Sequence, residues 1–151
     1  KNCPGVSLVV ITGRNKQLKN RLENRNWNIP VRVYGFVNNM PELMQAADVL
    51  ASKAGPGTIS EALICQLPII LYSYMPGQED GNIDYVVKEG VGHWAPELKN
   101  FISVINQWVA NPSSIQAARQ ACLRLARPDA AADIAGELAR RAIAIHQAQK
   151  N

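Results

Sequence analysis

The sequence predicts a single α/β domain: a doubly wound, Rossmann-like parallel sheet of about five to six strands, followed by extra C-terminal helices. Short runs rich in Val and Ile alternate with longer amphipathic segments as far as residue 95, and only helical patterns follow. The chain has 151 residues, of which 47% are hydrophobic. This is enough for one buried core and short for two, so we expect residues 1–151 to fold as one domain.

Five apolar runs have the length and composition of strands. They are residues 6–12, 31–37, 49–52, 68–74 and 91–95. Four segments of helical length and spacing separate them, namely residues 16–26, 40–47, 58–66 and 82–89. A helix between successive strands favours parallel pairing, because the chain must cross back before the next strand begins.

Three helices are predicted after residue 95, at residues 97–111, 114–127 and 130–149, with Pro112 and Pro128 between them. The last is rich in Ala and has Ile134, Leu138 and Ile145 on one stripe. We expect this stripe to pack on the domain. A membrane-binding helix is the alternative.

The net charge of +4 is concentrated at the N-terminal end. Residues 1–32 contain seven lysines or arginines and one acid, Glu23. The simplest interpretation is a solvated helix face, and the alternative is a surface that attracts phosphates or anionic lipid headgroups. Nucleic acid is not expected as a partner, because no aromatic or glycine-rich RNA-binding signature accompanies the charge.

The cysteines Cys3, Cys65 and Cys122 are odd in number, widely spaced and not in a CxxC pair. The pattern favours neither a disulfide framework nor a metal site, and we expect a reducing compartment. No apolar run reaches the roughly 20 residues that a membrane-spanning helix needs. The chain begins with Lys1 and shows no signal-peptide layout, so we expect it to be a piece of a longer protein.

Two glycine-containing loops follow predicted strands at the sheet edge where ligands of parallel sheets bind. Gly13 ends the first strand before a helix, where free amides and the helix dipole favour an anion. In the second loop, Gly55 and Gly57 leave the backbone bare at the start of a helix predicted to begin at Thr58. Thr58 and Glu61 also match a capping box, which is the competing, purely structural interpretation.

A third loop, residues 76–82, places an amide and two carboxylates together at Gln78, Glu79 and Asp80. Such groups accept hydrogen bonds from vicinal hydroxyls, which suits a sugar better than a phosphate. A flexible polar turn is the alternative. The three loops together predict a nucleotide-sugar pocket.

The stretch "ADVLASKAGPGTISEALICQLPIILYSYMPGQEDGNIDYVVKEGVG", residues 47–92, closely resembles the C-terminal domain of monogalactosyldiacylglycerol synthases and related processive diacylglycerol glycosyltransferases. "VVITGRNKQL" and "VYGFVNNMPELMQAAD" fit the same pattern, so the resemblance covers roughly residues 6–95. It implies the C-terminal half of a GT-B fold and an inverting transferase that uses a UDP-sugar as donor substrate, with no cofactor and no metal.

The resemblance also implies roles for individual residues, each at a position that matches the family's motifs. The uracil would lie near Phe36 and Val37, and the ribose hydroxyls would bind Glu61. The other implied contacts are the diphosphate at Gly13, Gly57 and Thr58 beside Gly55, the transferred sugar at Gln78 and Glu79, and the phosphates at Asn82.

No catalytic residue is expected in this chain, because the family's base lies in an N-terminal acceptor domain and neither His93 nor His146 matches it. His93 is expected to be structural. The resemblance implies a lipid acceptor bound through that other domain and a full-length protein peripheral to the cytoplasmic side of a membrane. The rival functions are a GT-B-fold sugar-nucleotide epimerase and a non-catalytic nucleotide-binding module. The sequence predicts neither the donor sugar nor the oligomeric state.

Overall fold

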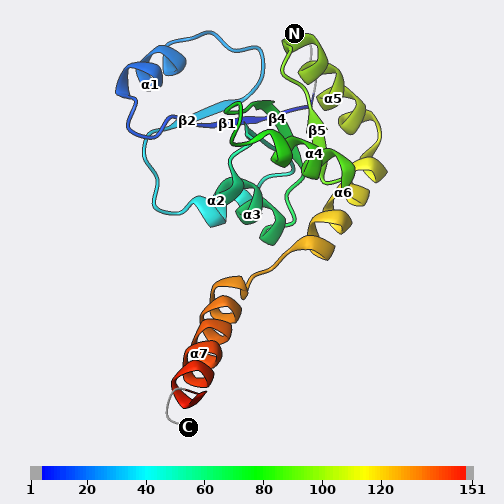
Figure 1. The fold of residues 1–151 in the computed structure, drawn as a ribbon. Helices are drawn as coiled ribbons and strands as arrows, with labels where there is room; N and C mark the ends of the chain where they lie inside the picture. Colours follow the sequence, from blue (N-terminus) through cyan, green and yellow to red (C-terminus); the bar gives the residue numbers. More distant parts are fainter. Residues whose placement is uncertain (1–4, 149–151) are drawn as a thin grey trace.

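A computed structural model describes residues 5–148, so Cys3 and Gln149 lie outside the described residues. The order of elements follows the predicted alternation, with five strands and seven helices in the described part (Figure 1). The strands are β1 (Leu8–Ile11), β2 (Val31–Tyr34), β3 (Leu50–Lys53), β4 (Ile69–Ser73) and β5 (Gly92–Trp94). The helices are α1 (Lys16–Glu23), α2 (Met40–Gln45), α3 (Pro56–Ile64), α4 (Asp80–Lys88), α5 (Leu98–Ala110), α6 (Pro112–Leu125) and α7 (Ala130–Ala148).

The α/β class and the parallel pairing are confirmed, but the strands form two sheets where one was expected. β1 pairs with β2, and β3, β4 and β5 form a second sheet in that order, with Leu50 opposite Ile69 and Ile69 opposite Gly92. β1 and β2 have four residues each, and none of their residues is fully buried. Four-residue strands without a fully buried side chain gain little free energy from pairing with a further strand.

The core lies around the three-stranded sheet, and β4 is its centre. Alternate side chains of a strand point to opposite faces. Ile69 and Leu71 accordingly belong to a cluster formed with α2, α3, α4 and α6. Ile70 points to the other face, where it packs with Ala95 and with Trp108 of α5. Helices therefore cover both faces of this sheet, as the doubly wound prediction requires.

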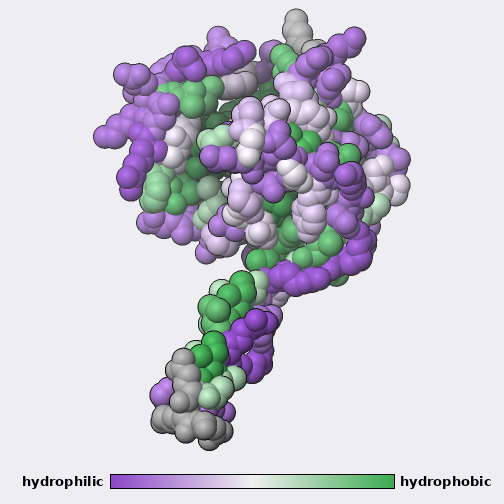
Figure 2. Space-filling view, in the orientation of Figure 1, coloured by the Kyte–Doolittle hydropathy of each residue, from purple (hydrophilic) through white to green (hydrophobic). Residues whose placement is uncertain are grey.

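α7 extends away from the rest of the molecule (Figure 1), and none of its described residues is buried. Ile134 is 62% exposed and Leu138 is 63% exposed, so the prediction that this stripe packs on the domain is wrong. α6 ends at Leu125 and Pro128 stands before α7, so α7 is a separate helix, and its polar contacts are made within itself. Figure 2 shows the apolar side chains along one side of α7.

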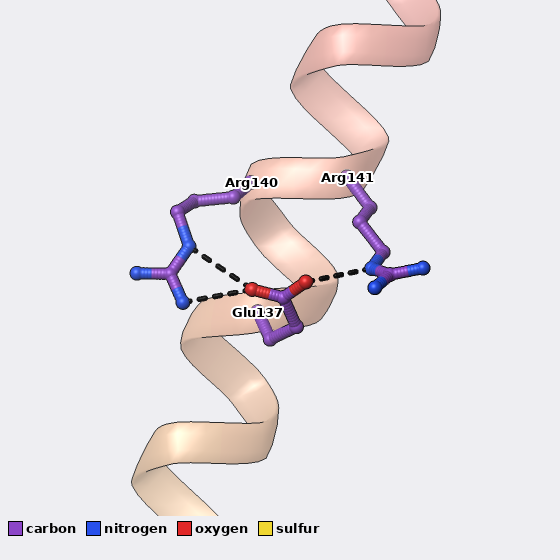
Figure 3. A network of polar contacts seen from close by, with 3 residues as sticks. All are labelled: Glu137, Arg140 and Arg141. Atoms are coloured by element: carbon purple, nitrogen blue, oxygen red, sulfur yellow. Dashed lines mark hydrogen bonds and ion pairs between the residues drawn. The ribbon is translucent and has the colours of Figure 1, made fainter.

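Glu137 organises the charged side of α7 (Figure 3). Its carboxylate pairs with Arg140 at 2.8 Å and with Arg141 at 2.7 Å. Hydrogen bonds from Arg141 and Arg140 lower the pKa of Glu137. These exposed contacts within one helix support α7 locally and attach it to nothing else. Among the helices described, none is both long enough and apolar enough to cross a membrane.

Candidate functional site

The junction between β3 and α3 differs from the prediction in where the helix begins. α3 starts at Pro56, and Gly55 is its N-cap in extended backbone with φ −68° and ψ 130°. Proline suits the first helical position because its fixed φ is helical and its missing N–H would have no partner there. Thr58 is therefore inside the helix, no side-chain cap bond forms, and the capping box with Glu61, which was the competing structural interpretation, is excluded.

This early start leaves a bare helix end that faces open space. The amide of Ile59 donates to the carbonyl oxygen of Gly55 at 3.1 Å, which closes the first helical turn. The preceding amides, those of Gly57 and Thr58, have no backbone acceptor among residues 5–148. A Cβ added at Gly57 would meet no atom within 4 Å. The free amides and the positive end of the helix dipole make this junction receptive to an anion.

The loop between β4 and α4 is held by its own acidic side chains. The amide of Met75 donates to Glu79 Oε2 at 2.7 Å, and the amide of Gly77 donates to Asp80 Oδ2 at 2.6 Å. Gly77 has a φ of +80°, which L-residues with a side chain rarely adopt. The loop is thus held by its own hydrogen bonds, which argues against the alternative of a flexible turn, and Gln78 remains exposed on it.

The structure brings these two loops together. Asn82 Nδ2 donates to the carbonyl oxygen of Ala54 at 2.8 Å, which joins the start of α4 to the end of β3. A Cβ added at Gly55 would lie 3.7 Å from Glu79 Oε1, so the glycine leaves the space beside this carboxylate open. Gly55, Glu79 and Asn82 therefore form one small group, and Asn82 keeps a second amide N–H for another acceptor.

Glu61 lies on the exposed side of α3 and has no hydrogen bond or ion pair among the described residues. It is one turn before Cys65, a free thiol whose pKa is raised mainly by burial and also by the negative charge of Glu61. With the capping box gone, nothing in the described part of the chain occupies this carboxylate. Its role toward a ribose stays a prediction.

The remaining predicted residues stand on the two-stranded sheet. Gly13 has a φ of +56°, and Asn15 caps α1 by accepting from the amide of Leu18 at 2.9 Å. Phe36 is 65% exposed, and the guanidinium of Arg14 lies over its ring at 5.4 Å. Val37 is half-buried. In Figure 1 this sheet and α1 lie to one side of the three-stranded sheet, so the site divides into two groups on separate sheets.

Two cavities border the β4–α4 region, and sequence reasoning identified neither. The first, about 330 Å³, is lined by Tyr74, Asp80, Gly81, Ile83, Asp84 and Trp94. The second, about 290 Å³, lies between α3, α4 and the α6–α7 connection and has Pro56 and Asn82 in its wall. An aromatic residue at the carboxyl end of each of two adjacent strands, Tyr74 after β4 and Trp94 at the end of β5, was the available signal for the first cavity.

His93 packs with its ring 5.2 Å from that of Trp108, in agreement with the structural role predicted for it. Partial burial lowers its pKa, because the interior disfavours the charged imidazolium. Within residues 5–148 no group of His, Cys, Asp and Glu is placed to hold a metal ion. The thiol of Cys122 is buried, which raises its pKa to about 11.

Comparison with known proteins places these features in a family. Residues 3–134 match the model of the glycosyltransferase family 28 C-terminal domain. The chain is 44% identical over 136 residues to the chloroplastic monogalactosyldiacylglycerol synthase of Spinacia oleracea, covering 89% of this chain and 26% of the relative. It is 44% identical over 132 residues to monogalactosyldiacylglycerol synthase 3 of Arabidopsis thaliana, covering 87% and 28%. The chain thus spans about a quarter of the length of these relatives, and the resemblance expected from the motifs is confirmed.

Solved structures support the fold. The glycosyltransferase of kitacinnamycin superposes on 89% of this chain, and on 35% of its own, with a TM-score of 0.58 and 18% identity. The glycosyltransferase SnogD from Streptomyces nogalater covers 90% of this chain and 43% of its own, with a TM-score of 0.51 and 18% identity. The predicted fold, the C-terminal half of a GT-B glycosyltransferase, is confirmed.

Proposed function

The chain belongs to the glycosyltransferase family 28 C-terminal domain family, and on that premise we propose that it binds the UDP-sugar donor of a hexosyltransferase. The full-length protein would transfer galactose or glucose to diacylglycerol or a similar lipid, because relatives at 44% identity bear the name monogalactosyldiacylglycerol synthase. The bare start of α3 beside Glu79 and Asn82 is the observation that supports donor binding most directly.

Each part of the donor has a matching group of residues in this proposal. The diphosphate binds at the amides of Gly57 and Thr58, with Gly13 and Asn82 as further contacts. Glu61 accepts hydrogen bonds from the ribose hydroxyls. The remaining contacts are Gln78 and Glu79 with the hexose, and Phe36 and Val37 with the uracil.

The chemistry that this chain contributes is stabilisation of the leaving group. As the anomeric bond breaks, negative charge grows on the UDP, and preorganised amides at a helix end stabilise that charge without reorganising. The acceptor hydroxyl must also lose a proton to a base. We place that base in the part of the full-length protein outside this chain, and we place the whole protein at a membrane surface where its lipid acceptor resides.

The test compares UDP with pyrophosphate in calorimetric titrations of Glu61→Ala. Loss of a charged hydrogen-bond acceptor should weaken UDP binding roughly tenfold or more, whereas pyrophosphate, which lacks a ribose, should bind as before. Glu97→Ala is the matched control, because Glu97 is also exposed and makes no cap bond at the start of α5. Equal losses for the two ligands would contradict the ribose role of Glu61.

A further inference from the structure

The cavity lined by Tyr74 and Trp94 lies on the opposite side of β4 from the proposed donor contacts. β4 has β3 on one side and β5 on the other. Glu79 and Asn82 face the β3 side, where they meet Gly55 and Ala54. Trp94 ends β5 and lines the cavity together with the first residues of α4. The cavity therefore has its own lining residues, although its Asp80 and Gly81 stand between Glu79 and Asn82 at the start of α4.

The walls of this cavity combine two aromatic rings with two carboxylates. The rings of Tyr74 and Trp94 meet edge to face, with centroids 5.5 Å apart. Asp80 and Asp84 come from successive turns of α4. None of the six lining residues is cationic, so a phosphate or another anion would be repelled. The cavity, about 330 Å³, is shallow and open to solvent, so it would hold a small ligand against one face and not enclose it.

The carboxylates of Asp80 and Asp84 each already have one polar partner, and this favours a neutral ligand over a cation. Asp80 accepts the amide of Gly77 through Oδ2, and Asp84 pairs with Lys88 through Oδ2 at 3.2 Å. Their charge is thus partly balanced, while each keeps a second oxygen that can accept a hydroxyl proton. Aromatic rings beside hydroxyl acceptors suit a pyranose ring, whose C–H face is apolar and whose rim is polar.

We propose that this cavity binds a hexose ring other than the donor's, with the Trp94 ring against the sugar's C–H face, the perpendicular Tyr74 ring at its side, and Asp80 and Asp84 accepting its hydroxyls. The ligand is a neutral hexoside without a nucleotide. The inference does not depend on the nucleotide role of Gly57 and Glu61, since it concerns different side chains and a ligand without a nucleotide.

The experiment is a titration of the chain with methyl β-galactoside, observed by NMR through the tryptophan indole N–H signals. The chain has three tryptophans, and Trp94→Phe assigns the signal of interest. Trp27, whose indole N–H donates to the carbonyl of Leu22, and the buried Trp108 serve as internal controls. The Trp94 signal alone should shift and saturate at millimolar sugar, as expected for so small a ligand.

Two variants separate a hydrogen-bonding role from a change in local charge. Asp84→Asn should weaken the sugar about threefold or more, because a carboxylate acceptor is lost. Lys88→Ala removes the same ion pair and keeps the carboxylate, so its affinity should stay within about twofold of the parent. No shift at Trp94, or equal losses in both variants, would overturn the proposal.

Two further titrations test the identity of the ligand. Tetramethylammonium should leave the Trp94 signal in place, and a saturable shift with this cation would overturn the choice of a sugar. Saturating UDP-galactose should leave the affinity for methyl β-galactoside within about twofold. Displacement of the hexoside by UDP-galactose would show that the cavity holds the donor's own sugar, which would overturn a separate hexose site. The absence of any nucleotide effect at Gly57 would count against the proposed function alone.

Discussion

The two sheets of this domain differ in how firmly they are built. In the three-stranded sheet, Ile69, Ile70 and Leu71 of β4 are completely buried and have helices on both faces. In the two-stranded sheet no residue is fully buried, and Val9 is 51% exposed. The loops proposed to hold the diphosphate and the sugar follow β3 and β4, whereas the predicted uracil contacts follow β2. Under the proposed function, the sugar contacts and most of the diphosphate contacts therefore lie on the firmly packed part, whereas Gly13 and the uracil contacts lie on the more yielding part.

The largest expected effect comes from Gly92→Ala. A Cβ at Gly92 would overlap the backbone carbonyl oxygen of Ile69, and backbone atoms of a paired strand cannot move aside cheaply. We expect the free energy of unfolding to fall by about 3 kcal/mol or more, measured by urea denaturation. Gly35→Ala, next to the two-stranded sheet, is the control. The Cβ added at Gly35 would lie 3.6 Å from its nearest neighbour, the carbonyl oxygen of Gly13, which is an ordinary contact distance. Similar losses in both variants would remove the contrast between the sheets.

Ile69→Ala and Val10→Ala sharpen the same comparison through side-chain packing. Ile69 is completely buried, so its truncation should cost about 2–5 kcal/mol of unfolding free energy. Val10 is half-buried, and its truncation should cost about 1 kcal/mol. Denaturant titrations of both variants measure the difference. A Val10→Ala loss as large as that of Ile69→Ala would show that the two-stranded sheet is as well packed as the other.

The smallest expected effect is the pH dependence due to His93. Burial lowers the pKa of His93 in the folded state, whereas the unfolded chain has the ordinary value of about 6.5. The unfolded state therefore binds more protons, and the unfolding free energy falls as the pH drops through this range. His93→Phe keeps an aromatic ring against Trp108 and should have a shallower decline between about pH 7.5 and pH 5.5. A parallel decline in parent and variant would exclude His93 as a source.

The alternation of apolar runs and amphipathic segments was sufficient to predict every strand and helix of the described residues in order. Two features were beyond it. The division into two sheets depends on how lightly β1 and β2 are covered, which a Val- and Ile-rich run such as residues 6–12 does not reveal. The stripe of Ile134 and Leu138 looks the same in sequence whether or not a surface covers it.

For the candidate site, the sequence was sufficient to predict a glycine-rich junction between β3 and α3, but not the residue at which α3 begins. Thr58-x-x-Glu61 has the letters of a capping box, and Pro56 shifted the helix two residues earlier. The hydrogen bond from Asn82 to Ala54 joins residues that are 28 positions apart, so no local sequence pattern predicts it. The cavity at Tyr74 and Trp94 arises in the same way, from the pairing of β4 with β5.

The most direct test of donor binding is a titration of the chain with UDP, observed through its backbone amide NMR signals. We expect saturable shifts at Gly57 and Thr58, where amides without backbone acceptors would meet the diphosphate, together with a shift at Gly13. Gly136 on the exposed α7 should not respond. Absence of any shift at Gly57 and Thr58 at millimolar UDP would show that the start of α3 does not bind the diphosphate.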